Sequence, residues 1–321
     1  MTPKIEPGTK ILAIVGPTAS GKTKVATFIA YRLPCEIVSM DSAKVYKGMD
    51  IGTSKLKNEE LERHHYHLVN VYDPRENYSV ALFKEMAEKA IFDITNRGKT
   101  PLLVGGSGLY FRALVDDLDF SNTSDTEQNL RTKLESLSTE ELCEILSDKD
   151  PKAAAKIPEN NRRRLIRAIE IALKGTRLLS EMQTSWKDYS SPYDIKAAGL
   201  ICEREVLYER IDRRVDEMIK SGFIEEVKRL RRLGLKRGTT AGESLGYRQI
   251  LDYLDGKLEL NKAVSDIKKR TRNLAKRQIT WFKKDPRVKW FYVPMRKGMK
   301  TEEEGKILEN VAKKILEYFQ A

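Results

Sequence analysis

The sequence contains few of the residues from which zinc sites and disulfide frameworks are built. Its three cysteines, Cys35, Cys143 and Cys202, lie far apart in the chain. Their spacing matches neither a zinc motif, in which ligands come in close pairs, nor the dense pattern of a small disulfide-stabilised protein. Widely separated free cysteines are usual in a reducing compartment, so we expect a cytoplasmic protein.

Long apolar runs are also missing. Near the start of the chain the longest uninterrupted run is Ile11–Val15, far shorter than the roughly 18 residues that a membrane-spanning helix needs. Met1–Lys10 contains prolines and mixed charges, and no apolar region of a secretory signal follows it. We therefore expect no membrane partner. Glycine and proline occur at ordinary levels, and 40% of the residues are hydrophobic, which excludes collagen-like and disordered chains.

Positive charge is what the sequence has in excess. It contains 59 lysines and arginines against 47 aspartates and glutamates, a formal net charge of +12. Lys228–Arg237 holds six basic residues in ten, and Asn261–Lys284 holds nine with a single acid. Apolar residues recur at helical spacing in the second segment, which predicts an amphipathic helix with a basic face. A solvated surface helix would explain that segment alone, but two such segments favour a nucleic acid partner.

One short motif carries specific chemistry. Gly16–Thr23, GPTASGKT, matches the phosphate-binding P-loop pattern GxxxxGK[ST] between a predicted strand and a predicted helix. Its backbone N–H groups and the helix start attract an anion, Lys22 adds a mobile charge, and the Thr23 hydroxyl can bind Mg²⁺. The motif indicates a bound di- or triphosphate rather than ATP hydrolysis, with a plain glycine-rich turn as the alternative. The residues expected to bind the diphosphate are Gly16, Thr18, Ala19, Ser20, Gly21, Lys22 and Thr23.

Short apolar segments alternate with helical patterns in the first third of the chain, and a further apolar segment occurs at residues 195–202. The predicted strands are residues 10–15, 36–40, 67–71, 101–104 and 195–202, and the predicted helices include 21–33 and 79–97. Such alternation is typical of a parallel α/β sheet. We therefore predict an α/β fold, in which a P-loop-containing parallel sheet flanked by helices spans residues 1–118 and 196–321. A helical insertion domain, residues 119–195, interrupts it.

Two aspartates are candidates for the polar chemistry beside the P-loop. A P-loop ATPase holds Mg²⁺ with an aspartate at the end of a second strand, but the strand predicted at 101–104 ends without one. Asp73 could substitute, or it could be a turn residue before Pro74. Asp41 follows the second predicted strand and should share a sheet edge with the P-loop. Its carboxylate could act there as a general base, or it could cap a loop or helix.

Seven segments, in this order, resemble one known family over most of the chain. They are GPTASGKT (16–23), DSAKVYKGMDIGTSK (41–55), PLLVGGSGLYFRAL (101–114), RRLIRAIE (163–170), SGFIEEV (221–227), LGYRQ (245–249) and AKRQITWF (275–282). Together they closely resemble the tRNA dimethylallyltransferase family, also called tRNA isopentenyltransferase. The bacterial form is the closer match, because the C-terminal zinc finger of many eukaryotic members has no counterpart in the sequence.

The resemblance implies a reaction. Dimethylallyl diphosphate would donate its five-carbon group to N6 of the adenosine 3′ of the anticodon, tRNA position 37, and release diphosphate. Mg²⁺ would be the cofactor, the anticodon stem-loop of tRNA the partner, and the protein is expected to be a monomer. The alternatives are an adenylate isopentenyltransferase, a P-loop small-molecule kinase and an ATP-dependent RNA-binding module. The basic segments argue against the first two, and the missing second aspartate argues against the third.

The resemblance also implies roles for individual residues. Asp41 corresponds to the general base of the family. Arg214, with the adjacent Arg213 as the alternative, corresponds to an arginine that stabilises the leaving diphosphate together with Lys22 and Thr23. The helical insertion would contact the anticodon arm. The residues expected to bind tRNA are Asp41, Ser42, Ala43, Lys44, Ser107, Arg163, Arg164, Leu165, Ile166, Arg167, Glu243, Ser244, Leu245, Gly246, Tyr247 and Arg248.

Some of these residues have alternative explanations. Arg163, Arg164 and Arg167 stand at the start of a predicted helix, where positive charge opposes the helix dipole. An approaching phosphate would reverse that unfavourable interaction, so tRNA contact is the better explanation. Ser107 could also be a helix N-cap. The only histidines fall within His64–His67, but neither their spacing nor a cysteine or carboxylate partner supports a metal site.

Overall fold

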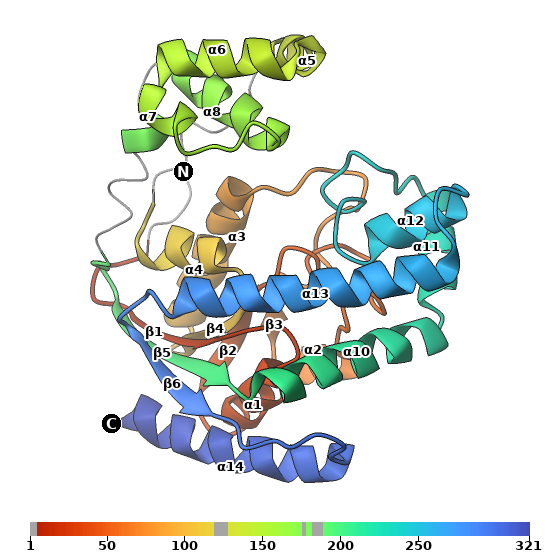
Figure 1. Cartoon of the computed structure of the whole chain (residues 1–321). Coiled ribbons are helices and arrows are strands. Elements are labelled where there is room, and N and C mark those ends of the chain that lie inside the picture. The colour runs from red at the N-terminus through yellow and green to blue at the C-terminus, as the bar shows by residue number, and fades with distance from the viewer. Residues whose placement is uncertain (1–4, 119–127, 175–177, 182–188) are drawn as a thin grey trace. The chain divides into compact units, whose positions relative to one another are not determined.

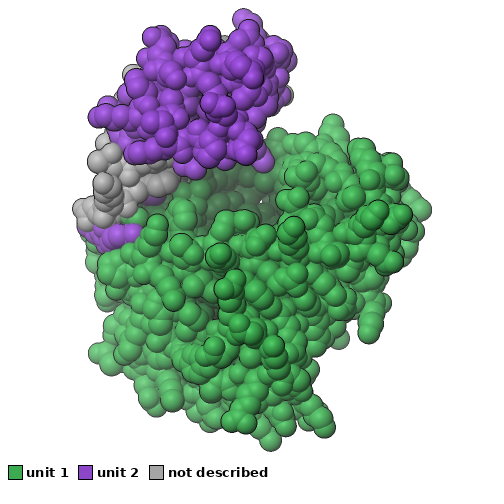
Figure 2. Space-filling view, in the orientation of Figure 1, with its two compact units in different colours: residues 1–117, 191–321 green, residues 118–190 purple. Residues whose placement is uncertain are grey.

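The chain forms two compact units in the computed structural model, which describes residues 5–118, 128–174, 178–181 and 189–321. The first unit consists of Met1–Asp117 and Ser191–Ala321, and the second, coloured separately in Figure 2, is Leu118–Ser190. The second unit is thus an insertion into the first. It ends at Ser190 rather than at the expected 195, and strand β5 (Asp194–Ile201), which pairs with β1 (Lys10–Val15) from its first residue, belongs to the first unit. Residues 119–127, at the start of the expected insertion, lie outside the described part.

A six-stranded sheet lies at the centre of the first unit (Figure 1). Its strand order is β3-β2-β4-β1-β5-β6, and every neighbouring pair is parallel. The strands are β1 Lys10–Val15, β2 Cys35–Met40, β3 Tyr66–His67, β4 Thr100–Gly105, β5 Asp194–Ile201 and β6 Val288–Tyr292. This is the predicted α/β architecture, with P-loop strand β1 in the interior of the sheet.

Helices cover both faces of this sheet, so β1 is buried on both sides. Ile11, Ala13 and Val15 belong to one core, and the alternate residues Leu12 and Ile14 belong to the other. This double burial explains why the central strands are continuous apolar runs. The helices of the first unit are α1 Lys22–Ala30, α2 Asn58–Arg63, α3 Val80–Asn96, α4 Gly108–Val115, α10 Arg204–Lys220, α11 Phe223–Arg232, α12 Tyr247–Leu254, α13 Leu260–Phe282 and α14 Thr301–Gln320. Within the described residues, none of the helices has the length and apolar character to span a membrane.

Two strands differ from the sequence prediction. β3 covers Tyr66–His67 rather than 67–71, because Leu68 and Asn70 have left-handed φ angles of 61° and 58° that end the extended conformation. β6 was not predicted. It is an edge strand in which only Val288 is buried, so it lacks the continuous apolar run that marks the interior strands. The other expected strands are present within one residue of their predicted bounds.

The second unit has a hydrophobic core of its own. Its helices are α5 Gln128–Ser136, α6 Thr139–Lys149, α7 Pro151–Ala154 and α8 Arg162–Lys174. Leu142 and Leu146 on α6 pack with Leu165 and Ile169 on α8. A separate core of this kind is what allows an insertion to behave as a small domain.

A buried carboxylate is surrounded by basic groups at the start of β2. Glu36, only 2% exposed, accepts hydrogen bonds from Arg97 Nη2 at 2.6 Å and Lys99 Nζ at 2.9 Å. His67 Nε2 lies 2.7 Å from the same group. Burial opposes ionisation of the carboxyl group, but the hydrogen bonds from Lys99, Arg97 and His67 outweigh it and lower the pKa of Glu36 to about 2. His67 therefore stabilises the sheet through this ionic group.

Replacing Glu36 with Gln should lower the free energy of unfolding at pH 7 by about 1–3 kcal/mol, because charge-assisted hydrogen bonds are weakened. The pKa of Glu36 is lower in the folded protein than its ordinary value of 4.5. The stabilisation is therefore complete above that pH and is lost as the pH falls toward 2. Urea titrations at pH 7, 5 and 3 should show the difference between wild type and variant shrinking with acid. Glu62→Gln, at an exposed position, is the control, and a difference independent of pH would contradict the assignment.

Candidate active site

Three segments that the sequence singled out meet at one edge of the sheet. Val15, Met40 and Gly105 are aligned in the register of the parallel strands β1, β2 and β4. The residues that follow these strand ends are the P-loop, Asp41 and Gly106, so they lie side by side at the carboxyl edge. This edge is where ligands bind in open α/β sheets.

The P-loop has the backbone geometry of a phosphate site. Gly16 has a φ of 138°, and a Cβ there would lie 2.7 Å from the carbonyl oxygen of Leu200, so only glycine fits. Gly21, at φ 97°, is the N-cap of α1, which begins at Lys22. The hydroxyl of Ser20 is buried and has no hydrogen-bond partner among the described residues. A helix start and a buried hydroxyl without a partner among the described residues suit a phosphate group.

A cavity of about 420 Å³ opens at this edge, within the range of small-molecule sites. The P-loop, the loop after β2, the turn Ser54–Lys55 and the helices α10, α13 and α14 all contribute to its wall. Its charged and polar lining residues include Thr18, Lys22, Thr23, Ser39, Asp41, Lys44, Ser54, Lys55, Arg210, Arg213, Arg214, Gln278 and Glu304. The cavity therefore brings together the expected catalytic residues and five of the seven residues expected to bind the diphosphate, whereas Gly16 and Ser20 do not line it.

Several cationic side chains line this cavity, and three of them, Lys22, Lys44 and Arg214, influence one another's charge. Burial, reinforced by the charges of Lys44 and Arg214, lowers the pKa of Lys22 to about 7. Burial also lowers the pKa of Lys44 to about 8, with Arg214 acting in the same direction and Asp41 opposing it. Lys22 Nζ donates to the carbonyl oxygen of Pro17 at 2.6 Å. A bound polyanion would relieve the mutual repulsion of these groups, so the electrostatics favour a ligand with several negative charges.

Asp41 is both a loop cap and a wall of the cavity. Its Oδ1 accepts hydrogen bonds from the backbone N–H groups of Ala43 at 2.9 Å and Lys44 at 3.3 Å. Its Oδ2 forms no hydrogen bond with the described residues. The two explanations for Asp41 that the sequence left open are therefore compatible, because one oxygen holds the loop and the other is available to a substrate proton.

Arg214 and Arg213, adjacent in sequence, have different partners. Arg214 Nε donates to Ser54 Oγ at 2.8 Å, and its Nη1 lies 3.5 Å from Thr18 Oγ1 in the P-loop. Arg213 Nη2 is paired with Glu304 on α14 at 2.6 Å. Burial lowers the pKa of Arg214, whereas the hydrogen bond that Arg213 donates to Glu304 raises the pKa of Arg213. The geometry therefore favours Arg214 for a role toward a bound phosphate.

Sequence reasoning gave no role to Gln278, a residue of α13 that lines the cavity. Its Oε1 accepts a hydrogen bond from the backbone N–H of Thr18 at 2.8 Å. The glycines after β4 make room for α13, since a Cβ at Gly106 would lie 2.2 Å from Gln278 Nε2 and one at Gly108 would lie 2.0 Å from Trp281. Gln278 falls inside the segment 275–282 that carries the family resemblance, which is the signal that could have identified it.

Asp73 and His64 are not part of this site. Asp73 pairs with Arg75 at 2.7 Å, and hydrogen bonds from that side chain and its backbone lower the pKa of Asp73 to about 2. His64 packs edge-on against Tyr31. Within the described residues, no group of three histidines, cysteines or carboxylates could hold a metal ion. Asp73 is therefore a turn residue.

The loop after β2 and the start of α4 contain the first group of expected tRNA-binding residues. Ser42, Ala43 and Lys44 are all half-buried next to Asp41, and Lys44 lines the cavity. Ser107 is the N-cap residue of α4, but its side chain makes no capping hydrogen bond. The Ser107 hydroxyl is therefore not committed to the helix start.

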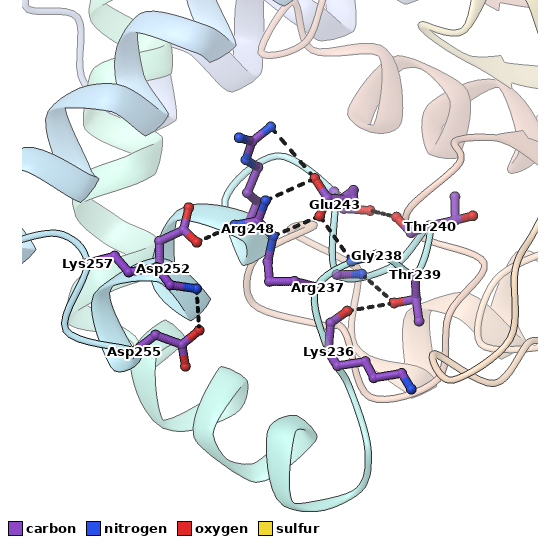
Figure 3. A network of polar contacts seen from close by, with 12 residues as sticks. Lys236, Arg237, Gly238, Thr239, Thr240, Glu243, Arg248, Asp252, Asp255 and Lys257 are labelled. Atoms are coloured by element: carbon purple, nitrogen blue, oxygen red, sulfur yellow. Dashed lines mark hydrogen bonds and ion pairs between the residues drawn. The ribbon is translucent and has the colours of Figure 1, made fainter. Parts of the chain in front are cut away.

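Glu243, which is half-buried, lies in an ionic network of the first unit (Figure 3). Its carboxylate accepts from Arg237 Nε at 2.7 Å and from the N–H of Gly238 at 3.1 Å, and Arg248 Nη1 lies 3.7 Å away. Burial opposes ionisation, yet the hydrogen bond from Arg237 lowers the pKa of Glu243. Arg237 also pairs with Asp252. Glu243 thus orients two arginines, which explains an acid in a segment expected to bind a nucleic acid.

Burial distinguishes the remaining residues of 244–248. Ser244 Oγ donates to the carbonyl oxygen of Thr240 at 3.1 Å, and Leu245 packs against the core. Gly246 is the N-cap of α12 at φ 93°. Tyr247 is fully buried, so its side chain cannot contact RNA from this position. The Arg248 side chain is 43% exposed, so among the side chains of this segment it is the best placed for a phosphate.

The expected tRNA-binding residues at the start of α8 are also a mixture of exposed and buried side chains. Arg163 and Arg164 are exposed, whereas Leu165 and Ile166 are buried in the core of the second unit. These two apolar side chains hold the helix in place, and the expectation that this stretch of α8 binds tRNA stays a prediction. Arg167 Nη1 pairs at 2.8 Å with the fully buried Glu170. Arg167 therefore has a structural role as well.

Comparison with known proteins identifies close relatives. A family model described as IPP transferase matches residues 44–285, and one described as isopentenyl transferase matches residues 9–72. A tRNA dimethylallyltransferase of Carboxydothermus hydrogenoformans is 44% identical over 286 residues, covering 88% of this chain and 91% of the relative. Another, from Caldanaerobacter subterraneus, is 40% identical over 314 residues, covering 96% of this chain and 97% of the relative.

Solved structures agree with these relatives. A tRNA isopentenylpyrophosphate transferase from Bacillus halodurans has a TM-score of 0.68 at 39% identity, covering 97% of this chain and 98% of its own. A eukaryotic dimethylallyltransferase acting on tRNA has a TM-score of 0.74 at 27% identity, covering 89% and 74%. The parallel sheet, the P-loop motif and the cationic cavity define an α/β protein of the P-loop class. The family match extends over well more than half the chain, so this chain belongs to the IPP transferase family. The resemblance inferred from the sequence is confirmed.

Diphosphate binding should take up protons at about pH 8. In the free protein Lys22 has a pKa of about 7 and is mostly neutral at that pH, whereas an anion beside it raises the pKa and restores the ammonium group. Calorimetric titration with inorganic diphosphate, in buffers that differ in ionisation enthalpy, counts the protons. Lys22→Arg, which keeps the charge but does not titrate, should take up fewer protons by up to about one. Equal uptake by both proteins would show that Lys22 is already charged.

Proposed function

We propose that this protein is a tRNA dimethylallyltransferase. It transfers the dimethylallyl group of dimethylallyl diphosphate to N6 of the adenosine 3′ of the anticodon, tRNA position 37. The observation that carries the proposal is the shared cavity, in which a P-loop, the carboxylate of Asp41 and the guanidinium of Arg214 meet. Relatives named tRNA dimethylallyltransferase that cover most of the chain support it.

The diphosphate of the donor binds in the P-loop. Residues Gly16–Thr23 supply backbone N–H groups and a helix start, and Lys22 and Arg214 supply positive charge. Negative charge grows on the bridging oxygen as the allylic C–O bond breaks. Because the cations are already fixed in the cavity, they stabilise this charge without reorganisation in the transition state.

Asp41 acts as the general base. The exocyclic amine of adenine is a weak nucleophile, because its lone pair is delocalised into the ring. A carboxylate that accepts a proton from the amine during attack on the prenyl carbon makes the reaction easier. Asp41 suits this role because its Oδ1 is held by two backbone N–H groups while its Oδ2 has no hydrogen bond within the described part of the chain.

Mg²⁺ is the proposed cofactor, and the Thr23 hydroxyl would hold it together with oxygens of the diphosphate. The donors around Thr23 are hard oxygens, and Ser39 and Asp41 line the same cavity. The described residues do not form a complete carboxylate site, which is the usual situation for Mg²⁺ bound through substrate phosphates. When bound, the ion would add positive charge beside the leaving group.

The tRNA would contact exposed basic residues of both units. Arg163 and Arg164 lie at the start of α8, and Arg248 lies at the start of α12. The anticodon arm is the part of tRNA that carries the target adenosine, so the helical insertion is the proposed docking element for it. A monomer remains our expectation for the active species.

The other candidate activities fit less well. A small-molecule kinase or an adenylate isopentenyltransferase has no use for the basic segments, and the named relatives are tRNA enzymes. An ATP-dependent RNA-binding module needs a second aspartate for Mg²⁺, but Asp73 is paired with Arg75 and does not line the cavity.

Asp41→Asn is expected to lower the rate of prenyl transfer by about 10²–10⁴, the usual cost of removing a general base. The asparagine oxygen can still accept from the N–H groups of Ala43 and Lys44, so the loop is kept and only the base is lost. The measurement is single-turnover formation of prenylated adenosine, by nucleoside mass analysis, with dimethylallyl diphosphate, Mg²⁺ and saturating unmodified tRNA. Affinity for tRNA should change by less than about threefold, since surface charges dominate it. A near wild-type rate would leave Asp41 only its loop-capping role, and no product from the wild-type protein would refute the proposed function.

The exposed arginines of α8 should contribute to tRNA affinity through counterion release. Arg163→Ala with Arg164→Ala should weaken tRNA binding and lower the slope of log affinity against log salt by roughly 0.7–0.9 for each lost contact. The KM for dimethylallyl diphosphate should stay the same, because the P-loop belongs to the other unit. Filter binding over a salt series measures the slope.

Lys152→Ala with Lys156→Ala is the matched control for this test. It removes the same charge from exposed positions of the same unit, away from α8. Arg167 is left unchanged, because its loss would weaken the neutralisation of buried Glu170 and mix stability with binding. Equal salt slopes in wild type and the Arg163/Arg164 variant would exclude phosphate contacts at these arginines.

A further inference from the structure

Glu226, on α11, is a buried carboxylate that has no ion-pair partner within the described residues. It is 5% exposed. Its Oε2 accepts hydrogen bonds from the backbone N–H groups of Asp50 at 2.9 Å and Ile51 at 2.7 Å. Its Oε1 accepts from the N–H of Gly52 at 3.1 Å and from the hydroxyl of Tyr247 at 2.6 Å. A carboxylate has about four acceptor positions, so its capacity is fully used.

These contacts hold the turn Asp50–Ser54 against α11 and α12. Successive N–H groups that converge on one anion form a nest, and each bond is strengthened by the charge. If the turn moved away, the buried carboxylate would lose its compensation, which is costly. Close packing also holds the turn. Gly52 lies so near two aromatic rings that a Cβ there would be 2.2 Å from the ring of Phe223 and 2.7 Å from that of Tyr247.

The other side of the same turn faces Arg214. Arg214 Nε donates to Ser54 Oγ at 2.8 Å, and Nη2 donates to the carbonyl oxygen of Thr53 at 3.2 Å. Ser54 has a φ of 48°, a left-handed conformation that a residue with a side chain keeps only when its surroundings enforce it. The remaining nitrogen, Nη1, points to Thr18 of the P-loop at 3.5 Å. The orientation of the Arg214 guanidinium therefore depends on the conformation of the turn Asp50–Ser54.

We propose that Glu226 is a positioning residue for Arg214. It fixes the turn Asp50–Ser54, and the turn supplies the two acceptors that orient the guanidinium toward a diphosphate in the P-loop. Glu226 does not line the cavity and touches no substrate, so its effect reaches the site only through this turn. The proposal rests on the proposed function in one respect, that the cavity binds a diphosphate.

A purely structural role for Glu226 makes a different prediction. If the carboxylate only joined α11 to the rest of the core, its loss would reduce stability and the fraction of active protein, whatever residue stood at position 214. If it acts through Arg214, its effect on diphosphate binding should disappear once the guanidinium is gone. A double-mutant cycle separates the two cases.

The cycle consists of wild type, Glu226→Gln, Arg214→Met and the double variant. The readout is the Kd for inorganic diphosphate with Mg²⁺, measured by calorimetry and referred to the fraction of binding-competent sites. Glu226→Gln keeps the shape of the side chain and loses one acceptor, so we expect about tenfold weaker binding. Arg214→Met should weaken binding by more, and adding Glu226→Gln to it should change the Kd by less than about twofold.

Glu225→Gln is the matched control. Glu225 is the neighbour of Glu226 on α11, is exposed and pairs with Lys228 at 2.8 Å. It should leave the Kd unchanged in both backgrounds. Melting curves of all variants report stability separately. Equal losses from Glu226→Gln in the presence and absence of Arg214 would overturn the proposal.

A milder variant covers the case in which Glu226→Gln does not fold. Tyr247→Phe removes only one of the four hydrogen bonds to Glu226 and keeps the packing of the ring. It should weaken diphosphate binding by about two- to fivefold in the wild-type background and have no effect beside Arg214→Met. Additive effects would overturn the proposal. Because the readout needs no tRNA, a protein that fails to prenylate tRNA but shows this coupling would refute the proposed function and keep the role of Glu226.

Discussion

The crowding of positive charge at the carboxyl edge of the sheet is the constraint on which the site depends. Lys22, Lys44 and Arg214 face one cavity, and Asp41 only partly offsets them. Burial lowers the pKa of each cation, and neighbouring cations lower those of Lys22 and Lys44 further, so a bound polyanion would find its charge complemented here. The fold maintains this arrangement through backbone geometry, since glycines at the strand ends allow the P-loop, the loop at Asp41 and helix α13 to approach closely.

The same constraint explains the supports around the cavity. A guanidinium repelled by two lysines needs fixed acceptors, and the turn Asp50–Ser54 supplies them. Lys55 secures this turn from the side of the cavity, because its buried Nζ donates to the carbonyl oxygen of Tyr46 at 2.5 Å and to Asp50 Oδ1 at 3.0 Å. In the proposed reaction, negative charge develops on the diphosphate as the allylic C–O bond breaks. Positive charges that are already fixed in place can stabilise it without reorganisation. The hydrogen bonds that hold the turn Asp50–Ser54 in place therefore also hold the positive charge that the proposed reaction needs.

Local sequence patterns predicted the parts of this arrangement that depend on neighbouring residues. The P-loop and the position of Asp41 after a strand follow from short motifs, and the interior strands follow from continuous apolar runs. Edge strand β6 and the early end of β3 were missed, because edge burial and the left-handed Leu68 and Asn70 leave no such pattern. Gln278 and Glu226 were missed because they contact residues 260 and about 175 positions away.

Resemblance to a family identifies segments, but it does not separate residues that touch a ligand from residues that hold them. In 245–249, Gln249 accepts from the N–H of Gly246 at 2.9 Å and donates to Asp266 on α13 at 3.0 Å, and Tyr247 donates to Glu226. Both side chains are buried, so they fix the start of α12 while Arg248 is presented to solvent. On α8, Leu165 and Ile166 do the same for Arg163 and Arg164. In both segments, buried neighbours fix the position of the arginine that is proposed to contact RNA. A sequence motif lists all of these residues alike, because it does not show which of them are buried.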